Sequence, residues 1–259
     1  HMDGHSHILA ATNPAIRSFD PAYAYEIAHI MQHGLETMYG ENPQDVIFYI
    51  TLYNEPMVQP REPEGVDADG IKKGIYLLKE GSFEGVNPDA RRVQLLASGV
   101  GVPWALEAQE LLKRDYGVVA DVWSVTSWTE LRREAMACDE HNFLHPEAER
   151  ALPFVTRRLS GRPGPVVATS DYMRQVPDQI AQWVPARFVS LGADGFGFSD
   201  TRAAARRFFH IDGPSMAVRA LQVLAEEGQL DWSIPREAAE RYRLLDVTAG
   251  ASGSAGGES

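Results

Sequence analysis

The chain has 259 residues, of which 44% are hydrophobic and 23% are charged, and its formal net charge of −12 comes without the basic stripe of a nucleic-acid binder. No apolar run approaches the roughly 18 residues that cross a bilayer, and no secretory leader opens the sequence, so we expect no membrane or secreted protein. The single cysteine, Cys138, excludes an internal disulfide and indicates the reducing cytoplasm.

The first seven residues, HMDGHSH, hold three of the eight histidines. Neutral imidazoles could bind zinc there with Asp3 as a further ligand, but the spacing matches no zinc signature, so we expect no metal site. A cloning remnant would account for His1 and Met2. It would not account for residues 3–7, which include His5 and His7.

A helix and a strand follow this opening segment. Asp20 and Pro21 form a typical helix start, with a capping side chain before proline, and helical spacing of apolar residues continues to Gly40. Residues 46–53, VIFYITLY, are rich in β-branched and aromatic side chains and predict a buried strand. The composition then becomes rich in proline and acidic residues, which indicates a linker over residues 55–69.

Beyond the linker, strand and helix patterns alternate, which predicts an α/β domain with a mostly parallel sheet covered by helices on both faces. We expect the strand at 46–53 to lie in a separate sheet, because the linker interrupts the pattern. The expected helices are 70–80, 103–116, 128–144, 173–184 with a break at Pro177, 199–209 and 215–229. The expected strands are 93–100, 118–127, 165–171 and 186–194. Residues 248–259 have nothing to bury and predict a flexible tail.

Three polar stretches at strand ends have open interpretations. Asn54 and Glu55 end the strand at 46–53, where they face a cleft or form the turn into the linker. Ser170 and Asp171 follow another strand, where we expect them to cap the next helix. The glycine-rich turn before Ser199 could hold an anion at a helix start, but a tight strand-to-helix connection is the favoured interpretation.

Six stretches, taken in order, resemble the homodimeric type of pyruvate dehydrogenase decarboxylase component, a thiamine-diphosphate-dependent family of the transketolase group. The variant with Phe198 resembles its actinobacterial branch. The six stretches are residues 1–6, 20–28, 39–56, 124–131, 169–173 and 191–202.

The resemblance implies the C-terminal portion of a much longer protein. Residues 1–54 would be the end of the pyrimidine-binding middle domain and residues 70–247 a transketolase C-terminal-like domain. The complete enzyme would act as a homodimer. It would decarboxylate pyruvate with thiamine diphosphate and magnesium, and acetylate a lipoyl group of a dihydrolipoamide acetyltransferase.

The resemblance also implies what this chain lacks. The family motif for the diphosphate and magnesium, G-D-G followed by an asparagine, is absent from the sequence. We therefore expect the chain alone to hold no cofactor and to be inactive. Two alternatives remain open: a non-catalytic binding or regulatory module, and one half of a split transketolase-like enzyme.

The resemblance places the opening segment at an active site. His1 matches a family histidine that lines the cavity and contacts the bound substrate adduct. Asp3 would orient a neighbouring imidazole, and His5 would lie near the same loop. These three residues are the catalytic candidates, and the role of His7 is less firmly implied.

Overall fold

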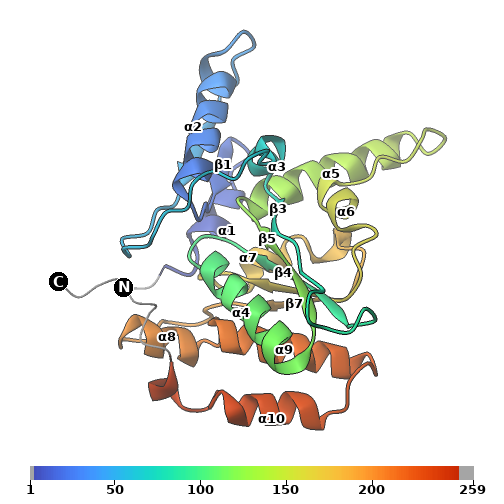
Figure 1. The fold of residues 1–259 in the computed structure, drawn as a ribbon. Helices are drawn as coiled ribbons and strands as arrows, with labels where there is room; N and C mark the ends of the chain where they lie inside the picture. The colour runs from blue at the N-terminus through green and yellow to red at the C-terminus, as the bar shows by residue number, and fades with distance from the viewer. Residues whose placement is uncertain (1–2, 251–259) are drawn as a thin grey trace.

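The computed structural model describes residues 3–250, which form an α/β fold with two sheets (Figure 1). The larger sheet has five strands in the order β3-β5-β4-β6-β7, and the smaller has two, β1 and β2. The strands are β1 Ile16–Phe19, β2 Ile47–Ile50, β3 Tyr76–Lys79, β4 Arg92–Ala97, β5 Val119–Ser124, β6 Val166–Thr169 and β7 Phe188–Leu191. The mostly parallel sheet and the separate sheet for residues 46–53 are confirmed.

The α-helices connect these strands and cover the larger sheet. They are α1 Ser6–Ala11, α2 Ala24–Tyr39, α3 Ala68–Lys73, α4 Gly101–Tyr116, α5 Trp128–Leu144, α6 Phe154–Leu159, α7 Gln175–Asp178, α8 Arg202–Phe208, α9 Gly213–Glu226 and α10 Ser233–Arg241. Two short 3-10 helices, Ala181–Trp183 and Val247–Ala249, complete the described chain.

The larger sheet is buried on both faces, as parallel sheets normally are. In β4, Leu95 packs in the cluster formed with α4 and α9, whereas Leu96 packs with Trp123, Trp128 and other side chains of the opposite cluster. Successive strand residues point to opposite faces, so each central strand needs an apolar run rather than an alternating pattern. Figure 1 shows α4, α9 and α10 on one side of this sheet.

The expected helix over residues 70–80 is wrong. Helix α3 ends at Lys73 because Gly74 adopts a left-handed conformation with a φ of 107°. The chain then turns into β3, an edge strand that pairs antiparallel with β5. A Cβ on residue 74 would also lie 2.5 Å from the carbonyl oxygen of Ser127, so glycine is required at this turn.

Two predicted helix starts are also wrong. Helix α2 begins at Ala24 after Tyr23, because the Asp20 side chain is turned into the protein instead of capping the helix. Helix α8 begins at Arg202, and the Thr201 side chain caps it by accepting a hydrogen bond from the N–H of Ala204.

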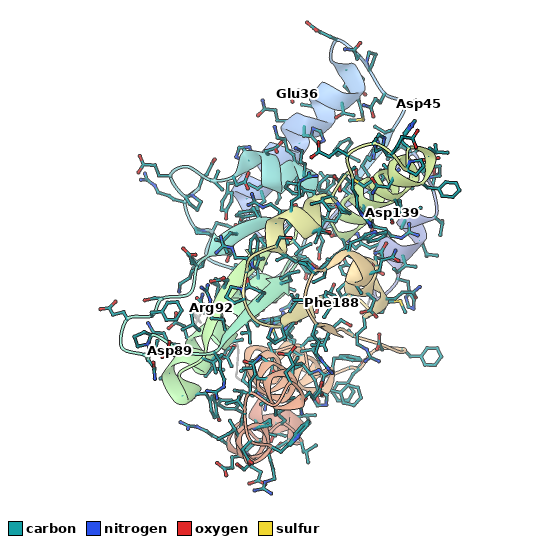
Figure 2. All side chains as sticks on the ribbon, turned by 90° about the vertical axis from the view of Figure 1, so that its right-hand side faces the viewer. Glu36, Asp45, Asp89, Arg92, Asp139 and Phe188 are labelled. Atoms are coloured by element: carbon teal, nitrogen blue, oxygen red, sulfur yellow. The ribbon has the colours of Figure 1, made fainter. Side chains whose placement is uncertain are left out.

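The smaller sheet and α2 form a lobe that projects from the larger sheet (Figure 1). Figure 2 shows Glu36 and Asp45 at the outer end of this lobe. Strands β1 and β2 pair in parallel, with Ile16 opposite Ile47. A buried carboxylate, described next, joins the lobe to the larger sheet.

Glu26 of α2 is fully buried against the larger sheet. Its Oε1 accepts hydrogen bonds from the hydroxyls of Tyr76, at 2.7 Å, and Ser124, at 2.6 Å. Its Oε2 accepts from the backbone N–H groups of Ala22 and Tyr23. Burial raises the pKa of Glu26, while these four donors favour its ionised form. Each carboxylate oxygen is therefore matched to two donors.

We predict that Glu26→Gln lowers the free energy of unfolding by about 2 kcal/mol, because its NH2 group would face two hydrogen-bond donors in a buried site. Chemical denaturation at neutral pH measures the change. The control is Glu36→Gln on the exposed side of the same helix, where a change within about 0.5 kcal/mol is expected. Equal effects of the two substitutions would contradict the assignment.

Candidate functional site

Asp20 lies one residue beyond β1 and connects three parts of the chain. Its Oδ1 accepts hydrogen bonds from the Thr51 hydroxyl, at 2.8 Å, and the Tyr53 hydroxyl, at 2.7 Å. Its Oδ2 accepts from the Ser98 hydroxyl at 2.7 Å. The backbone carbonyl of Asp20 accepts from the N–H of Gly99. Asp20 thereby holds the chain after β2 against the chain after β4.

His7 packs against this group from α1 and is only 3% exposed. Its Nε2 lies 3.1 Å from the Thr51 hydroxyl oxygen, and its ring makes an edge contact with Tyr172 at a centroid distance of 4.6 Å. Burial lowers the pKa of His7, although the charges of Asp20 and Asp3 act in the opposite direction. Because Thr51 donates its proton to Asp20, neutral His7 donates from Nε2.

The predicted catalytic residues lie at the start of the chain. His1 lies outside the described residues. Asp3 is exposed, and its Oδ1 accepts from the backbone N–H groups of His5 and Ser6, each at 3.0 Å. Burial would raise the pKa of Asp3, but hydrogen bonds from Ser6 and His5 hold it below its usual value. Asp3 therefore starts α1, and within residues 3–250 no imidazole hydrogen-bonds to it.

A cavity of about 1030 Å³ lies beside this segment. It opens at the carboxyl ends of β2, β6 and β7, where open α/β sheets generally bind ligands. Its walls come from Asp3, residues 49–55, Asp171, residues 196–200 and Arg206, together with their neighbours.

The cavity settles the open interpretation of Asn54 and Glu55, since both line it. Glu55 is held by the Arg206 guanidinium through both carboxylate oxygens, and Asn54 Oδ1 accepts from Arg202 at 3.2 Å. The Arg206 guanidinium also lies over the Trp104 ring, 4.5 Å from its centroid. These contacts fasten α8 to the end of β2.

Asp171 lines the same cavity, and the expectation that it caps a helix is wrong. Ser170 accepts a hydrogen bond from the N–H of Tyr172, but no hydrogen bond to the Asp171 carboxylate occurs among the described side chains and backbone. Burial raises the pKa of Asp171 to about 6, although the charge of Arg206 opposes this. Asp171 is half-buried, so the open cavity gives its carboxylate access to solvent or to a ligand.

The expected tight strand-to-helix connection is wrong, because residues 192–201 separate the end of β7 from the start of α8. Gly195 and Gly197 both have left-handed φ angles, 94° and 96°. They present Phe196 to solvent at the mouth of the cavity.

Sequence reasoning missed Asp20 and its partners. Asp20 followed by Pro21 has the pattern of a helix start. Hydroxyl side chains such as those of Thr51, Tyr53 and Ser98 are common at strand ends, so they gave no specific signal. The usable signal is that all of them follow predicted or observed strands at one edge of the fold.

Residues 74–212 match a family described as the transketolase-like TK C-terminal domain, and this match covers more than half of the chain. The chain belongs to the transketolase-like C-terminal domain family. Residues 1–60, before that domain, match a second family, the pyruvate dehydrogenase E1 component middle domain.

Relatives agree with both matches. The chain is 53% identical over 249 residues to the pyruvate dehydrogenase E1 component of Mycolicibacterium smegmatis, and 51% identical over 249 residues to that of Mycobacterium tuberculosis. Each match covers 96% of this chain and 26% of the relative, so the chain spans about a quarter of those proteins. The resemblance inferred from six stretches is confirmed.

A solved structure supports the transketolase-like fold. A transketolase variant from Pichia stipitis superimposes with a TM-score of 0.59 at 17% identity, covering 87% of this chain and 27% of that one. At this identity the similarity shows the fold alone.

Within residues 3–250, no group of three His, Cys, Asp or Glu side chains could hold a metal ion. The sequence also lacks the G-D-G motif of the family.

No helix within residues 3–250 is long and apolar enough to cross a membrane.

Gly99 is required beside Asp20, and we predict that Gly99→Ala destabilises the protein. The residue has a φ of 50°, and a Cβ would lie 2.5 Å from the Tyr53 hydroxyl and 2.8 Å from Asp20 Oδ1. We compare it with Gly117→Ala, where φ is 60° but no atom lies within 4 Å.

The Gly117 control measures backbone strain alone, about 1–2 kcal/mol. The free energy of unfolding should fall by about 2 kcal/mol more for Gly99→Ala than for Gly117→Ala, because the buried Asp20 carboxylate would lose hydrogen bonds. Thermal and urea unfolding of both variants test the difference, and equal losses would contradict it.

We predict that Asp171→Asn stabilises the protein at neutral pH. The pKa of Asp171 is raised to about 6 in the fold, so the folded protein favours the protonated carboxyl. This contribution to the free energy of unfolding is complete below the unfolded pKa and is lost as pH rises through about 6. Asparagine does not ionise. The free energy of unfolding of Asp171→Asn should therefore rise relative to the wild type by up to about 3 kcal/mol between about pH 4 and pH 7. The charges facing Asp171 are those of Arg206, Asp20 and Glu55.

Unfolding of both proteins in urea across this pH range measures the gain. Asp89→Asn serves as the control, because Asp89 is exposed, lies in the loop before β4 and does not line the cavity. A stability difference that does not grow with pH would refute the prediction for Asp171.

Proposed function

We propose that this chain is the C-terminal part of a pyruvate dehydrogenase E1-type enzyme. The complete enzyme would oxidatively decarboxylate pyruvate and acetylate a lipoyl group of a dihydrolipoamide acetyltransferase. The observation that carries the proposal is the 53% identity to a pyruvate dehydrogenase E1 component across 96% of the chain. The same proposal includes a homodimer in the cytoplasm.

We assign residues 1–54 to the end of the middle domain, residues 55–69 to a linker and residues 70–247 to the transketolase C-terminal-like domain. The family matches at residues 1–60 and 74–212 and the two separate sheets support this division.

The smaller sheet would be completed by the remainder of the protein. Two parallel strands rarely form a stable sheet alone, and Ile47 of β2 is 61% exposed. Three apolar residues of α2, spaced four apart, are also exposed: Met31, Leu35 and Tyr39. Further strands and helices of the middle domain would bury these surfaces.

Within the complete enzyme, this chain would supply a substrate-contacting loop. Thiamine diphosphate, held with magnesium by residues outside this chain, supplies the carbanion-stabilising chemistry. His1 would donate a hydrogen bond to the pyruvate carboxylate or move a proton. Asp3 fixes the turn after His1 through the N–H of His5, and His7 anchors the following helix on Thr51.

We predict that the chain alone neither binds thiamine diphosphate nor decarboxylates pyruvate. Calorimetric titration with the cofactor and magnesium tests binding, and turnover with an artificial electron acceptor tests activity. Adding the remaining portion of the protein should restore both. Micromolar cofactor binding by the isolated chain would contradict the assignment, and a completed protein without turnover would favour a binding or regulatory module.

We predict that His1→Ala in the complete enzyme lowers turnover by about 10²–10⁴-fold, the usual contribution of one acid–base side chain. The melting temperature should stay unchanged, since a polar loop residue contributes little packing. His145→Ala is the control, because His145 is exposed at the end of α5. Wild-type turnover of His1→Ala, or a large fall in its melting temperature, would remove the catalytic assignment.

A further inference from the structure

We propose that the cavity between residues 49–55 and residues 196–206 binds a cationic group, a primary ammonium or a guanidinium, which pairs with Asp171. This inference goes beyond the proposed decarboxylation, because it depends on the cavity of this chain alone.

Asp171 is the first reason. It is half-buried and lines the cavity, and within residues 3–250 no side chain or backbone group hydrogen-bonds to its carboxylate. The nearby buried Asp20 shows the usual arrangement, with hydroxyl donors on both oxygens. The carboxylate is thus free to pair across the cavity with a ligand that carries several N–H donors, and such charge-assisted hydrogen bonds are strong.

The charge around the cavity is the second reason. Four carboxylates line it, those of Asp3, Glu55, Asp171 and Asp200, against the two guanidinium groups of Arg202 and Arg206. The excess is therefore negative, which attracts a cation.

An anionic ligand is disfavoured by the contacts of the arginines. Arg206 is occupied by both oxygens of Glu55 and by the Trp104 ring, and Arg202 donates to Asn54. An anion would also meet the uncompensated charge of Asp171. The cationic class is thus the one that the charges fit.

The aromatic walls are the third reason. The cavity is lined by Tyr53, Tyr172, Phe196 and Phe198, and the faces of such rings attract cations. Tyr53 already donates its proton to Asp20, so it offers the ligand a ring rather than a donor. The hydrocarbon part of an alkyl amine would lie against these rings.

The stability cost of Asp171 agrees with a binding role. An acid whose pKa is raised in the fold is expected to lower stability at neutral pH, and destabilising groups of this kind cluster at ligand sites. Asp171→Asn should therefore fold normally and lose binding, which separates this role from a structural one.

The test uses n-butylammonium as the probe, with butyrate and 1-butanol as probes of equal length. Ligand-observed NMR should give n-butylammonium a Kd of about 1–20 mM, typical of a fragment with one ion pair, and the other two at least about tenfold weaker binding. Asp171→Asn should weaken n-butylammonium binding by about tenfold or more, since about 1.4 kcal/mol corresponds to tenfold.

Asp89→Asn is the matched control and should bind as the wild type does. The proposal is overturned if n-butylammonium does not bind, if butyrate binds equally well, or if Asp171→Asn leaves its affinity unchanged.

The complete protein distinguishes the two sources of the cation. If it binds n-butylammonium as the chain does, the natural ligand is a free amine. If it does not bind and Asp171→Asn destabilises it, a basic side chain of the remaining portion fills the cavity. A complete protein that binds nothing and is stabilised by Asp171→Asn would contradict the proposal.

Discussion

The whole edge of the fold where the strands end depends on one buried carboxylate, that of Asp20. Asp20 follows β1, and its two oxygens bind the hydroxyls of Thr51 and Tyr53, which follow β2, and of Ser98, which follows β4. A buried carboxylate is stable only with such donors, so the three segments must meet in one arrangement. His7 then adds the opening helix to the same group through Thr51.

Asp20 and Asp171 are two acids with different surroundings at this edge of the fold. Both are acids at the ends of strands, yet Asp20 has hydroxyl donors and Asp171 has none among the described residues. Asp20 therefore contributes to the framework. Asp171 instead lines a cavity, at the position where α/β folds generally bind their ligands.

Much of the fold could be predicted from the sequence, because buried parallel strands and their helices have strong local patterns. Helix α5, for example, begins at Trp128 after the capping Ser127 and ends at Leu144, as predicted. Strand β3 could not be recognised, since a left-handed glycine at residue 74 separates it from α3 within one continuous apolar pattern. Asp20 was misassigned because Asp-Pro is typical of helix starts, and its real partners lie far along the chain. The cavity depends on the same kind of distant contact. Asp3, Asn54, Glu55 and the glycine-rich turn before Ser199 each had a possible site role from sequence, but nothing in the sequence indicated that they line one cavity together with Asp171.

The Glu26 contacts show that the boundary in the sequence is not a boundary in the fold. Residues 61–73 separate the two family matches, yet Glu26 in the first matched segment is hydrogen-bonded to Tyr76 and Ser124 in the second. Cutting the chain between the two matched segments would leave Glu26 without two of its hydrogen-bond donors. It would also leave the Tyr76 and Ser124 hydroxyls without their acceptor. The two halves are thus better treated as one folding unit, whose parts are joined by polar contacts that neither half can satisfy by itself.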